Sequence, residues 1–572
     1  MTKITLIFLL LVIIAVASPF KAYCIDTTQN NIFEETTEQS ELLSYDVKQF
    51  GSLTKSLNVI GNNEAILVVS NEQIIREPVI IPSNIILQFQ GKGILNIGST
   101  AKLLIKGPLY AERKQIFRGS GAVSFSGGIL RQLRPEWWGA KQDGISDDTR
   151  PVQATINSLP IGGGEVLFEE GTYVVNSISL PSNVSIVGSG RECVLEQKKN
   201  SKYCCSINPG NGGTPDPKDN KKNIVIRNIH FRGTVAFDGF SEHVYLLNIN
   251  AATDVAISDC WFSGWRGDAI YLGSSNFAHT ERHNMNIVIK NCDFDGVNNE
   301  NRNAISVIDC DGLEIYNNTF NRCTRQNMPG AIDMEPDANR FAVIRNINVS
   351  RNRFSQVGGN VGIISLVLPL RQKELLNPSR NIVIQNNAID GLIGTGRSKG
   401  LNITQNQNAD DADGSNEITI AYNDIKNTSR PFVLWGVKGV SIENNIFADS
   451  LFAALVSYSN GNNPRDVTFK DNVFSNLGSS DGHGVTVFDA ENISFSQNTF
   501  ENVTHTKNKH GSAIDLSRYF GNKILIENNN FKGGGSANAV IISRNRHDDA
   551  ELSNYITQYN SFDPGIKPVS LQ

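Results

Sequence analysis

Four successive segments decide the fold of this chain: IVIKNCDFDG (287–296), NAISVIDCDGLEIYNNTF (303–320), GAIDMEPD (330–337) and INVSRNRFSQ (347–356). A short motif occurs three times in them, in which alternating aliphatic residues are followed by Asn-Asn-x-Phe or a close variant. Between the second and third copies, a similar aliphatic strand carries three carboxylates, Asp333, Glu335 and Asp337. The repeated motif indicates the architecture, and the carboxylate strand is the strongest indication of chemistry.

The motif extends far beyond these segments. Eleven copies begin at residues 224, 255, 287, 313, 347, 382, 418, 440, 467, 493 and 524. The intervals between successive copies range from 22 to 36 residues, so the period is a minimum length with insertions. A solenoid behaves in this way, because each coil adds one set of strands and lets its turns vary in length.

Each copy specifies a strand followed by a sharp bend. Alternation with period two places the aliphatic and aromatic residues on one face of a strand. Asn suits the bend because it tolerates the left-handed backbone conformation and bonds to its own chain. In stacked coils each Asn lies above the next, which forms a ladder of side chains. The pattern therefore predicts an all-β protein, a right-handed parallel β-helix that is continuous over residues 162–545.

The start of the chain has a different character. Residues 4–17, ITLIFLLLVIIAVA, are too short an apolar run to span a bilayer, and small residues follow them. This is typical of a secretory signal peptide. We therefore expect a signal peptide over residues 1–24, a flexible polar linker over 25–44, and a secreted protein, extracellular or periplasmic, without a membrane span. The alternative is a lipidated Cys24, although the residues before it form a poor lipoprotein signal.

Two further regions precede the repeats. Residues 45–134 contain alternating strands without the Asn-Asn-x-Phe signature, which predicts either a separate small β-module or an irregular first section of the solenoid. Asp148, or the Asp before it, is a suitable N-cap for a helix over residues 147–158. Val152 and Ile156 fall at helical spacing, so we expect this helix to cover the open end of the solenoid core.

Charge and cysteine content disfavour other classes of protein. The net charge of −5 and the pI near 6.0 leave no basic surface for nucleic acid. Cys260 and Cys292 occupy the same position in successive repeats, where neighbouring coils lie about 4.8 Å apart. They form either a disulfide bridge or a stacked pair of buried free thiols. Metal binding by the cysteines is disfavoured, because no histidine accompanies them at close spacing.

The region where the repeats begin resembles a known superfamily. WWGAKQDGISDDTRPVQATIN (137–157), followed by GGGEVLFEEGTYVV (162–175), is similar to the opening of the pectate-lyase-like superfamily of β-helices. That superfamily includes polygalacturonases, polysaccharide lyases, epimerases and phage tailspikes. The resemblance covers about residues 135–545 and implies a β-helix domain over 135–572. It does not imply one reaction, since hydrolysis, β-elimination, epimerisation and plain binding all occur on this scaffold.

Motifs of two known activities are missing. The Arg-Ile-Lys of polygalacturonases is absent, and SDGHGV (480–485) is only loosely similar to their Gly-His-Gly motif. The Asp-Pro-His-Glu motif of alginate epimerases is absent too. WRGDAIYLG (265–273) and PGAIDMEPD (329–337) instead resemble segments of uncharacterised bacterial β-helix repeat proteins related to glycoside hydrolase family 28. The resemblance therefore transfers neither activity residue by residue.

Aligning the strands by their inward aliphatic residues identifies an outward column. Tyr271, Ser306 and Asp333 each follow an inward isoleucine, so they point outward on successive coils. Asp333 and Glu335 then share the outer face, about 6.5–7 Å apart along one strand. Such a separation favours an inverting over a retaining glycosidase. The residues expected to bind substrate are Arg302, Tyr271, Asp268 and Arg266, of which the arginines would reach a sugar carboxylate.

The leading hypothesis is a glycoside hydrolase acting on an acidic polysaccharide, with Asp333 and Glu335 as its acid/base pair and no cofactor. One of the two carboxyls must stay protonated near neutral pH, which a close like charge favours. The first alternative is a polysaccharide lyase, in which Asp333, Glu335 and Asp337 hold Ca²⁺ and Arg302 or a lysine abstracts the proton. An epimerase, and a non-catalytic glycan-binding or structural solenoid, also fit the sequence. The oligomeric state stays open.

Long connections surround the carboxylate strand. The longest intervals between repeats start at residues 313, 347 and 382. Extra length must leave the solenoid as loops, and long loops on a rigid scaffold commonly build sites. We expect the loops over 366–380 and 392–416 to wall the site and to bring four basic residues toward an anionic glycan: Arg371, Lys373, Arg397 and Lys399.

Overall fold

The computed structural model describes most of the chain after residue 41. The described residues are 42–126, 132–209, 220–274, 281–369, 374–392, 398–405, 415–459, 461–503, 511–519, 523–533, 538–542 and 549–571. The predicted signal peptide and nearly all of the predicted linker lie outside them. In this part of the chain, no helix is long and apolar enough to cross a membrane.

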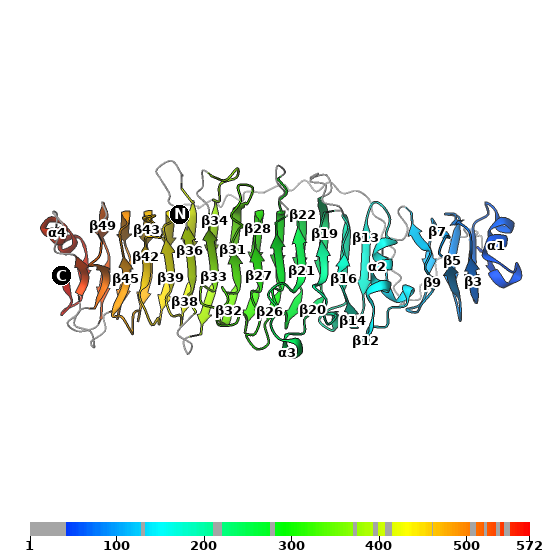
Figure 1. Ribbon diagram of the computed structural model, residues 1–572, viewed down its shortest axis with the longest axis horizontal. Helices are drawn as coiled ribbons and strands as arrows, with labels where there is room; N and C mark the ends of the chain where they lie inside the picture. Colours follow the sequence, from blue (N-terminus) through cyan, green and yellow to red (C-terminus); the bar gives the residue numbers. More distant parts are fainter. Residues whose placement is uncertain are drawn as a thin grey trace, which may run out of the picture. The chain divides into compact units, whose positions relative to one another are not determined.

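The main body of the chain is a solenoid of three parallel sheets, named here sheets 1, 2 and 3 in the order in which each coil visits them (Figure 1). Sheet 1 comprises β11(Gln132–Leu133), β13(Gly164–Phe168), β16(Val184–Gly188), β19(Lys221–Arg227), β22(Ala252–Ser258), β25(Met285–Lys290), β28(Cys310–Tyr316), β31(Ile344–Ser350), β34(Ile382–Gln385), β37(Ile418–Ala421), β40(Lys438–Glu443), β43(Arg465–Lys470), β46(Glu491–Ser496) and β49(Ile524–Glu527).

Sheet 2 lies beside it with similarly short strands. It comprises β12(Asp143–Asp147), β14(Gly171–Val175), β17(Cys193–Gln197), β20(His230–Arg232), β23(Trp261–Ser263), β26(Asp293–Asp295), β29(Thr319–Asn321), β32(Arg353–Val357), β35(Ala388–Gly391), β38(Asp424–Lys426), β41(Ile446–Ala448), β44(Val473–Ser475), β47(Thr499–Glu501), β50(Asn530–Lys532) and β52(Ser561–Phe562).

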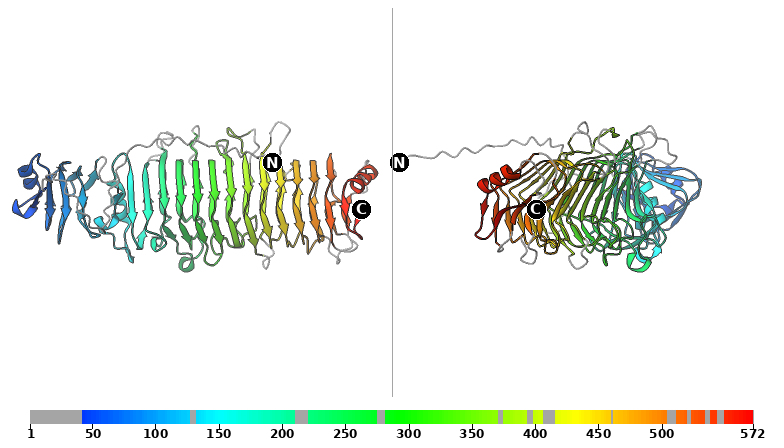
Figure 2. Two further views of the ribbon diagram at one scale, coloured as in Figure 1. Left: turned by 180° about the vertical axis from the view of Figure 1, so that it is seen from behind. Right: turned by 60° about the vertical axis from the view of Figure 1, so that its left-hand side comes forward.

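Sheet 3 completes each coil. It comprises β15(Ile178–Ser179), β18(Tyr203–Ile207), β21(Tyr245–Asn250), β24(Ile270–Gly273), β27(Ile305–Val307), β30(Ile332–Met334), β33(Ile364–Leu368), β36(Leu401–Gln405), β39(Phe432–Trp435), β42(Ala454–Ser457), β45(His483–Val487), β48(Ser512–Leu516), β51(Asn538–Ile542) and β53(Lys567–Leu571). Successive strands of each sheet stack in order along the solenoid (Figure 2). The predicted right-handed parallel β-helix is confirmed.

The turn from sheet 1 to sheet 2 is the most regular part of each coil. From β19 onward it always contains two residues, such as Asn317 and Asn318 between β28 and β29. The first of the two has a left-handed backbone, with φ of 56° at Asn317, which Asn adopts more readily than most residues. The second is buried, and its side-chain amide donates to the carboxamide oxygen one coil on, as from Asn318 to Asn352 at 3.0 Å. The predicted stacking of the Asn pairs is therefore confirmed.

The amide ladder runs through most of the solenoid. Its members are Asn318, Asn352, Asn387, Asn423, Asn445, Asn472, Asn498, Asn529 and Asn560. The phenylalanine of the motif points inward two residues later and stacks on its neighbours in the same way, with ring centroids 4.7 Å apart between Phe262 and Phe294. Polar ladder and aromatic stack together fix the register of every coil.

Cysteines start this column of turns. Cys260 and Cys292 occupy the ladder position on the two coils before Asn318, whose side chain accepts a hydrogen bond from the Cys292 backbone at 2.9 Å. Both thiols are free and buried. Of the two sequence alternatives, the stacked pair of free thiols is therefore the one that the structure shows.

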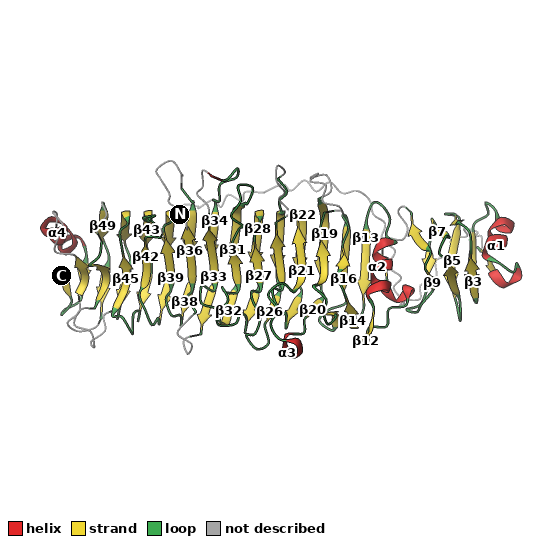
Figure 3. Ribbon diagram, viewed as in Figure 1, coloured by secondary structure: helices red, strands yellow, loops and turns green. Residues whose placement is uncertain are grey.

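Residues 45–134 form a short solenoid of their own. Its strands are β1(Leu43–Asp46), β2(Ala65–Val69), β3(Glu72–Ile75), β4(Val79–Ile81), β5(Ile85–Phe89), β6(Ile94–Ile97), β7(Lys102–Ile105), β8(Leu109–Tyr110), β9(Phe117–Gly119) and β10(Ala122–Phe125). They pair in parallel as three small sheets, and α1(Leu53–Ile60) lies at the start of the coils (Figure 3). Their core of buried residues, including Leu67, Leu87 and Leu103, is separate from that of the main solenoid.

The predicted capping helix is present as α2(Thr149–Asn157). Val152 and Ile156 are buried in the core of the main solenoid, with exposures of 1% and 2%, so this prediction is confirmed. Leu159, just after the helix, packs against both cores. The helix therefore lies at the junction of the two solenoids, beside the 3-10 helix η2(Pro135–Trp138).

The solenoid reaches further than predicted. It starts with β11 rather than at residue 162, and it ends with β53 rather than at 545. The helix α4(Asp549–Tyr559) interrupts its last coil before β52 and β53. This last coil was missed because α4 replaces the alternating sheet 1 strand before the bend, although Asn560 and Phe562 continue the ladder and the aromatic stack.

From β19 onward, variable length is confined to the two connections that flank sheet 3. Ten residues join β29 to β30 and nine join β30 to β31, whereas two join β28 to β29. The connection from β20 to β21 even contains the short helix α3(Val235–Asp238), at the lower edge of the solenoid in Figure 1. The outer face of sheet 3 thus runs between two rows of loops, as a binding face on a rigid scaffold requires.

Candidate active site on sheet 3

The predicted outward column is present on sheet 3. Strand register aligns Tyr271 with Ser306, Ser306 with Asp333, and Asp333 with Ser365 on four successive coils. The inward isoleucines before them are fully buried. Period-two alternation and parallel stacking therefore bring these side chains together although up to 35 residues separate neighbours in the sequence.

Arg302 lies at the centre of the polar cluster. It precedes β27 and its side chain is 14% exposed. Its guanidinium lies 3.2 Å from Asp268 Oδ2 and 3.7 Å from Asp333 Oδ2, and it donates to Ser306 Oγ at 3.0 Å. Glu242, from the loop after α3, lies 3.6 Å from Arg302 Nε. One cation thus bridges carboxylates from three different coils.

Asn303 ties the two buried aspartates to the same coil. Its backbone N–H donates to Asp268 Oδ1 at 3.2 Å, and its side-chain amide donates to Asp333 Oδ2 at 3.2 Å. The side-chain oxygen of Asn303 and Asp333 Oδ1 are buried without a hydrogen-bond partner in the part of the chain that the structure describes. Buried polar atoms are rarely left without a partner, so these two oxygens mark this cluster as unusual among the described residues.

Both aspartates are buried, and this changes their acidity. Asp268 is 0% exposed and Asp333 is 2% exposed. Burial raises the pKa of Asp333 to about 7, against the lowering effect of Arg302 and with further raising by Glu335 and Asp268. Burial likewise raises the pKa of Asp268 to about 6. Asp333 therefore carries a proton in a large fraction of molecules near neutral pH.

This burial corrects the expectation of an exposed acidic strand. Only Glu335 and Asp337 are exposed, while Asp333 is covered by its neighbours. Glu335 follows the last residue of β30, and its backbone N–H still donates to Val307 at 3.0 Å, so the strand pairing continues through it. Two residues apart on one strand, Asp333 and Glu335 leave the same face, and Glu335 raises the pKa of Asp333.

The other predicted binding residues divide into two groups. Tyr271 is half-buried, and its ring stacks on Tyr245 at 4.4 Å between centroids, which gives the cluster an aromatic side. Asp268 belongs to the centre, as described. Arg266 does not point into the cluster: it donates to the carbonyls of Asp238 and Gly239, at 2.9 and 2.7 Å, and so holds the α3 connection in place.

The three carboxylates named for calcium do not converge. Among the residues that the structure describes, no group of three or more His, Cys, Asp or Glu side chains is close enough to hold a metal ion. Asp333 is committed to Arg302 and Asn303, whose positive charge and donors compete with a cation. The positions of Asp333, Glu335 and Asp337 therefore do not support a catalytic step that uses Ca²⁺.

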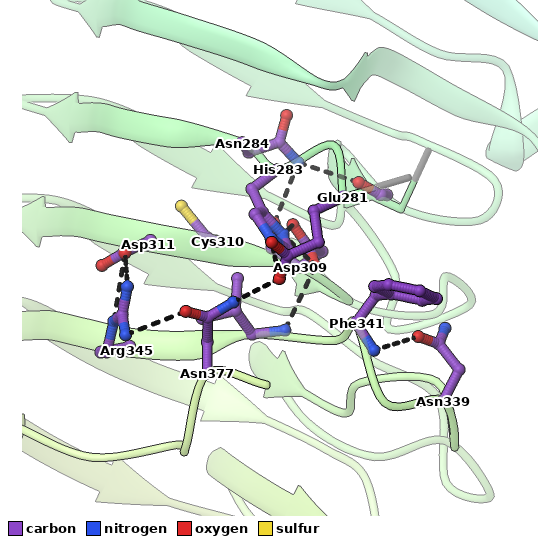
Figure 4. Close-up of polar contacts among 12 residues, drawn as sticks. Glu281, His283, Asn284, Asp309, Cys310, Asp311, Asn339, Phe341, Arg345 and Asn377 are labelled. Carbon is purple, nitrogen blue, oxygen red and sulfur yellow. Dashed lines mark hydrogen bonds and ion pairs between the residues drawn. The ribbon is translucent and has the colours of Figure 1, made fainter. Parts of the chain in front are cut away.

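A second polar cluster lies in the connections from sheet 3 to sheet 1 (Figure 4). His283 Nδ1 lies 3.0 Å from both carboxylate oxygens of Asp309. Burial opposes protonation of His283, but the bond with Asp309 outweighs it, and the net pKa is raised. Asn377 links Glu281, at 2.7 Å, to Arg345, at 3.3 Å, and so joins loops of several coils.

This second cluster was missed from the sequence, although a signal existed. His283 and Asp309 each stand four residues before the start of a repeat, at 287 and 313. Aligning the turns as well as the strands would have placed them side by side. Of the four basic residues expected in the loops, Arg371, Lys373 and Arg397 lie outside the described residues.

Comparisons with known proteins agree with this fold. Residues 137–360 match the family described as "Rhamnogalacturonase A/epimerase, pectate lyase-like". No curated protein matches the sequence. Pre-mature gene product 12 of bacteriophage phi29 is similar in structure, with a TM-score of 0.57 and 15% sequence identity. The match covers 77% of this chain but only 56% of the phage protein.

An enzyme shares the architecture as well. The catalytic unit of the GH87 α-1,3-glucanase from Streptomyces thermodiastaticus strain HF3-3 has a TM-score of 0.51 and 15% identity, with 72% of this chain and 70% of that chain covered. At such identity the likeness concerns the fold alone. Residues 137–360 thus match a pectate-lyase-like family, and the three parallel sheets fit the β-helix architecture of the pectate-lyase-like superfamily.

Proposed function

We propose that this protein is a secreted glycoside hydrolase that cleaves an acidic polysaccharide on the outer face of sheet 3. One observation carries the proposal: the buried carboxyl of Asp333, with a pKa of about 7, shares its strand face with the exposed Glu335. Acid catalysis at a glycosidic bond needs a carboxyl that stays protonated near neutral pH beside one that is ionised.

In this reaction Asp333 is the general acid. Its proton passes to the glycosidic oxygen as the bond between that oxygen and the anomeric carbon breaks. Glu335 takes a proton from a water molecule, whose oxygen forms the new bond to the anomeric carbon. The sum is one water consumed and two sugar ends formed. The spacing of the two residues along the strand, about 6.5–7 Å, suits attack from the opposite face and inversion.

The surroundings support these roles. Asp333 Oδ1 forms no hydrogen bond with the described residues, so this oxygen is the one on which the proposal places the catalytic proton, once the side chains that cover it give access to substrate. Arg302 provides one positive charge for the two carboxyls of Asp268 and Asp333, so the pair retains a proton near neutrality rather than ionising fully. The stacked rings of Tyr245 and Tyr271 offer an apolar face to a sugar beside the acid.

The family description supports a polysaccharide as the substrate class, and the similar glucanase shows that hydrolysis occurs on this fold. A lyase and an epimerase act on uronates through proton abstraction rather than proton donation to a leaving oxygen. A binding protein would leave the glycan intact. These alternatives differ in their products, so one assay separates them.

The test is a screen of purified protein against acidic and neutral polysaccharides, including an α-1,3-glucan. New reducing ends without ultraviolet absorbance indicate hydrolysis, whereas absorbance from a new double bond indicates elimination. We expect Asp333→Asn and Glu335→Gln each to lower turnover at least about 100-fold, since a positioned acid or base contributes 10²–10⁴-fold.

The matched controls are Asp424→Asn on sheet 2 and Glu314→Gln on sheet 1, two exposed carboxylates outside the candidate site. Both should retain parental turnover. If the Asp333 and Glu335 variants also keep full activity on a substrate that the parent degrades, this assignment of the acid and base is wrong.

A further inference from the structure

Two basic side chains lie on sheet 3, beyond the carboxylate cluster. Lys399 stands two residues before Leu401 at the start of β36, and Arg430 stands two residues before Phe432 at the start of β39. Leu401 and Phe432 are partners in strand register, so the two cations occupy equivalent positions on neighbouring coils. The Gly400 backbone donates to the Arg430 carbonyl at 2.9 Å, which keeps the two segments paired there.

Both cations are partly buried against aromatic rings. Lys399 Nζ lies 5.9 Å from the ring centre of Trp435 and donates to the carbonyl of Asn360 at 3.0 Å. The Arg430 guanidinium lies 5.1 Å from the ring of Phe452. Such contacts hold a cation in place without neutralising it.

Few carboxylates lie near Lys399 and Arg430. Asp481 Oδ2 lies 3.9 Å from Arg430, at the limit of an ion pair. Among the described residues, no carboxylate lies within ion-pair distance of Lys399. Burial and the charge of Arg430 both lower the pKa of Lys399, and burial lowers the pKa of Arg430 against the effect of Asp481. Two like charges thus stand on neighbouring coils with only Asp481 at the limit of ion-pair distance, an arrangement that favours an anion.

The pair is placed in line with the carboxylate cluster. Register along sheet 3 runs from Ile332 through Ile364 to Leu401 and then Phe432, so Lys399 lies two coils from Asp333 and Arg430 lies three. At about 4.8 Å per coil, these offsets are roughly 10 and 14 Å. One coil is about as long as one sugar ring, so the pair lies two to three sugars from the proposed acid.

The position equivalent to Lys399 and Arg430 is a glycine on the two coils before them. Gly330, on the coil of Asp333, and Gly362, on the next coil, stand two residues before Ile332 and Ile364, and both are buried. A Cβ at Gly330 would lie 1.7 Å from the carbonyl oxygen of Gly362, so the coils pack too closely there for a side chain. No charged side chain therefore occupies this position on the coils of β30 and β33.

We propose that Lys399 and Arg430 form a subsite that binds an acidic group of the polysaccharide, a uronate carboxylate or a sulfate, two to three sugars from Asp333. The half-buried Trp435 flanks this subsite and offers its ring to the same sugar. This inference deepens the proposed function by assigning the side chains that recognise the acidic group and its distance from the cleavage point, and it rests on that function for the direction in which the glycan lies.

Binding, measured separately from turnover, tests the subsite. Isothermal calorimetry with polygalacturonate oligomers, dextran sulfate and neutral dextran would compare the parent with Lys399→Met, Arg430→Gln and the double variant. Charged hydrogen bonds contribute about 1.5–3 kcal/mol each, so each single change should weaken binding of the anionic glycan by roughly 10- to 100-fold. Binding of neutral dextran should not change.

The matched controls are Lys470→Met on β43 and Arg353→Gln on β32, both exposed on other sheets. They should bind like the parent. Arg430→Lys keeps the charge and should retain most of the affinity, which guards against a loss caused by misfolding of Arg430→Gln. Preference for the carboxylated or the sulfated probe identifies which anion the subsite takes.

The possible outcomes separate the subsite proposal from the proposed hydrolysis. If the parent binds neither anionic probe, or if the double variant binds as tightly as the parent, the subsite does not exist. If the variants lose affinity while the parent cleaves nothing, the subsite stands and the proposed hydrolysis is wrong. If turnover depends on Asp333 but binding is indifferent to Lys399 and Arg430, only the subsite is wrong.

Discussion

Asp333 is the residue on which the proposed chemistry depends, and its acidity follows from its neighbours. The sequence places it on the outer face of a strand, where a carboxylate is ordinarily solvated and ionised. Arg302 and Asn303, from the preceding coil, cover it and leave one of its oxygens unpaired. Removal from water disfavours the charged form more than a single shared cation restores it, so the pKa rises.

This pKa has a consequence for stability. An unfolded Asp titrates near 3.9, whereas folded Asp333 titrates near 7. Between about pH 4 and pH 7 the folded state keeps a proton that the unfolded state has lost, so this group's contribution to stability falls as the pH rises. Asparagine cannot ionise. Asp333→Asn should therefore be more stable than the parent at pH 8, by up to about 4 kcal/mol, and equal to it near pH 4.

Urea unfolding of the parent and the variant at intervals from pH 4 to pH 8 measures this difference. The exposed Asp424→Asn serves as control and should show no pH-dependent gain. A difference between Asp333→Asn and the parent that stays constant with pH would show that the carboxyl titrates normally.

Substitution of Arg302 should have the opposite effect on stability at pH 8 to substitution of Asp333. Its removal leaves the carboxyls of Asp268 and Asp333 buried without a cation. Arg302→Gln should cost about 3–5 kcal/mol of stability at pH 8, where both carboxyls are charged, and clearly less at pH 5, where they hold protons. The same change should raise the pKa that governs the alkaline limb of activity. An equal loss of stability at both pH values would contradict the bridging role.

The sequence predicted part of this site and not the rest. Strand periodicity was sufficient to align Tyr271 with Ser306 and Ser306 with Asp333. It could not predict that Asp333 is covered, because the covering side chains come from a loop whose path depends on tertiary packing. Arg266 was assigned to substrate for the same reason, since its carbonyl partners lie in the α3 connection.

The element that makes the fold recognisable is the two-residue turn between sheets 1 and 2. Each ladder Asn, such as Asn423, satisfies buried backbone and side-chain groups at once: its amide donates to the Ile384 carbonyl and to Asn445, both at 2.9 Å. Because the same contacts repeat from coil to coil and require Asn at the same position, the signal was visible in one sequence. The short N-terminal solenoid turns without such a ladder, so its strands were predicted but its parallel coils were not.

Truncation of a ladder Asn should therefore lower the free energy of unfolding considerably. Asn423→Ala leaves the Ile384 carbonyl and the neighbouring amides without partners inside the core, at a cost of about 1–3 kcal/mol for each buried group. We expect a total loss of roughly 2–5 kcal/mol in urea unfolding. Asn530→Ala on the exposed face of β50 should change stability by less than about 0.5 kcal/mol. Equal effects of the two substitutions would mean that the ladder hydrogen bonds do not stabilise the fold.

The main solenoid combines one long core with one outer face to which we assign the proposed substrate. Along sheet 3, the tyrosine rings, the carboxylates around Arg302, the glycines before β30 and β33 and the cations Lys399 and Arg430 follow one another from β21 to β39. From β19 onward, constant turns between sheets 1 and 2 and variable loops on both edges of sheet 3 produce this division. Polysaccharides are extended and repetitive, and so is this face, which is why the proposed substrate suits it.

The two separate cores lead to a prediction for unfolding as a whole. Leu87 belongs to the small N-terminal core and Ile384 to the main core, and each is at most 1% exposed. Solenoid coils interact with their nearest neighbours, so destabilisation spreads along a continuous core but crosses a break weakly. Leu159 packs against both cores, so the two cores are separate but in contact through this residue.

Scanning calorimetry of the full chain should therefore show two transitions. Leu87→Ala and Ile384→Ala each remove a buried aliphatic side chain, at about 2–5 kcal/mol. The first should lower only the transition of smaller enthalpy, because the N-terminal core contains far fewer coils, and the second should lower only the larger one. Leu159→Ala should increase the difference between the two transition temperatures, because it weakens the contact between the cores. A single transition that shifts equally with Leu87→Ala and Ile384→Ala would show instead that α2 couples the two solenoids into one cooperative unit.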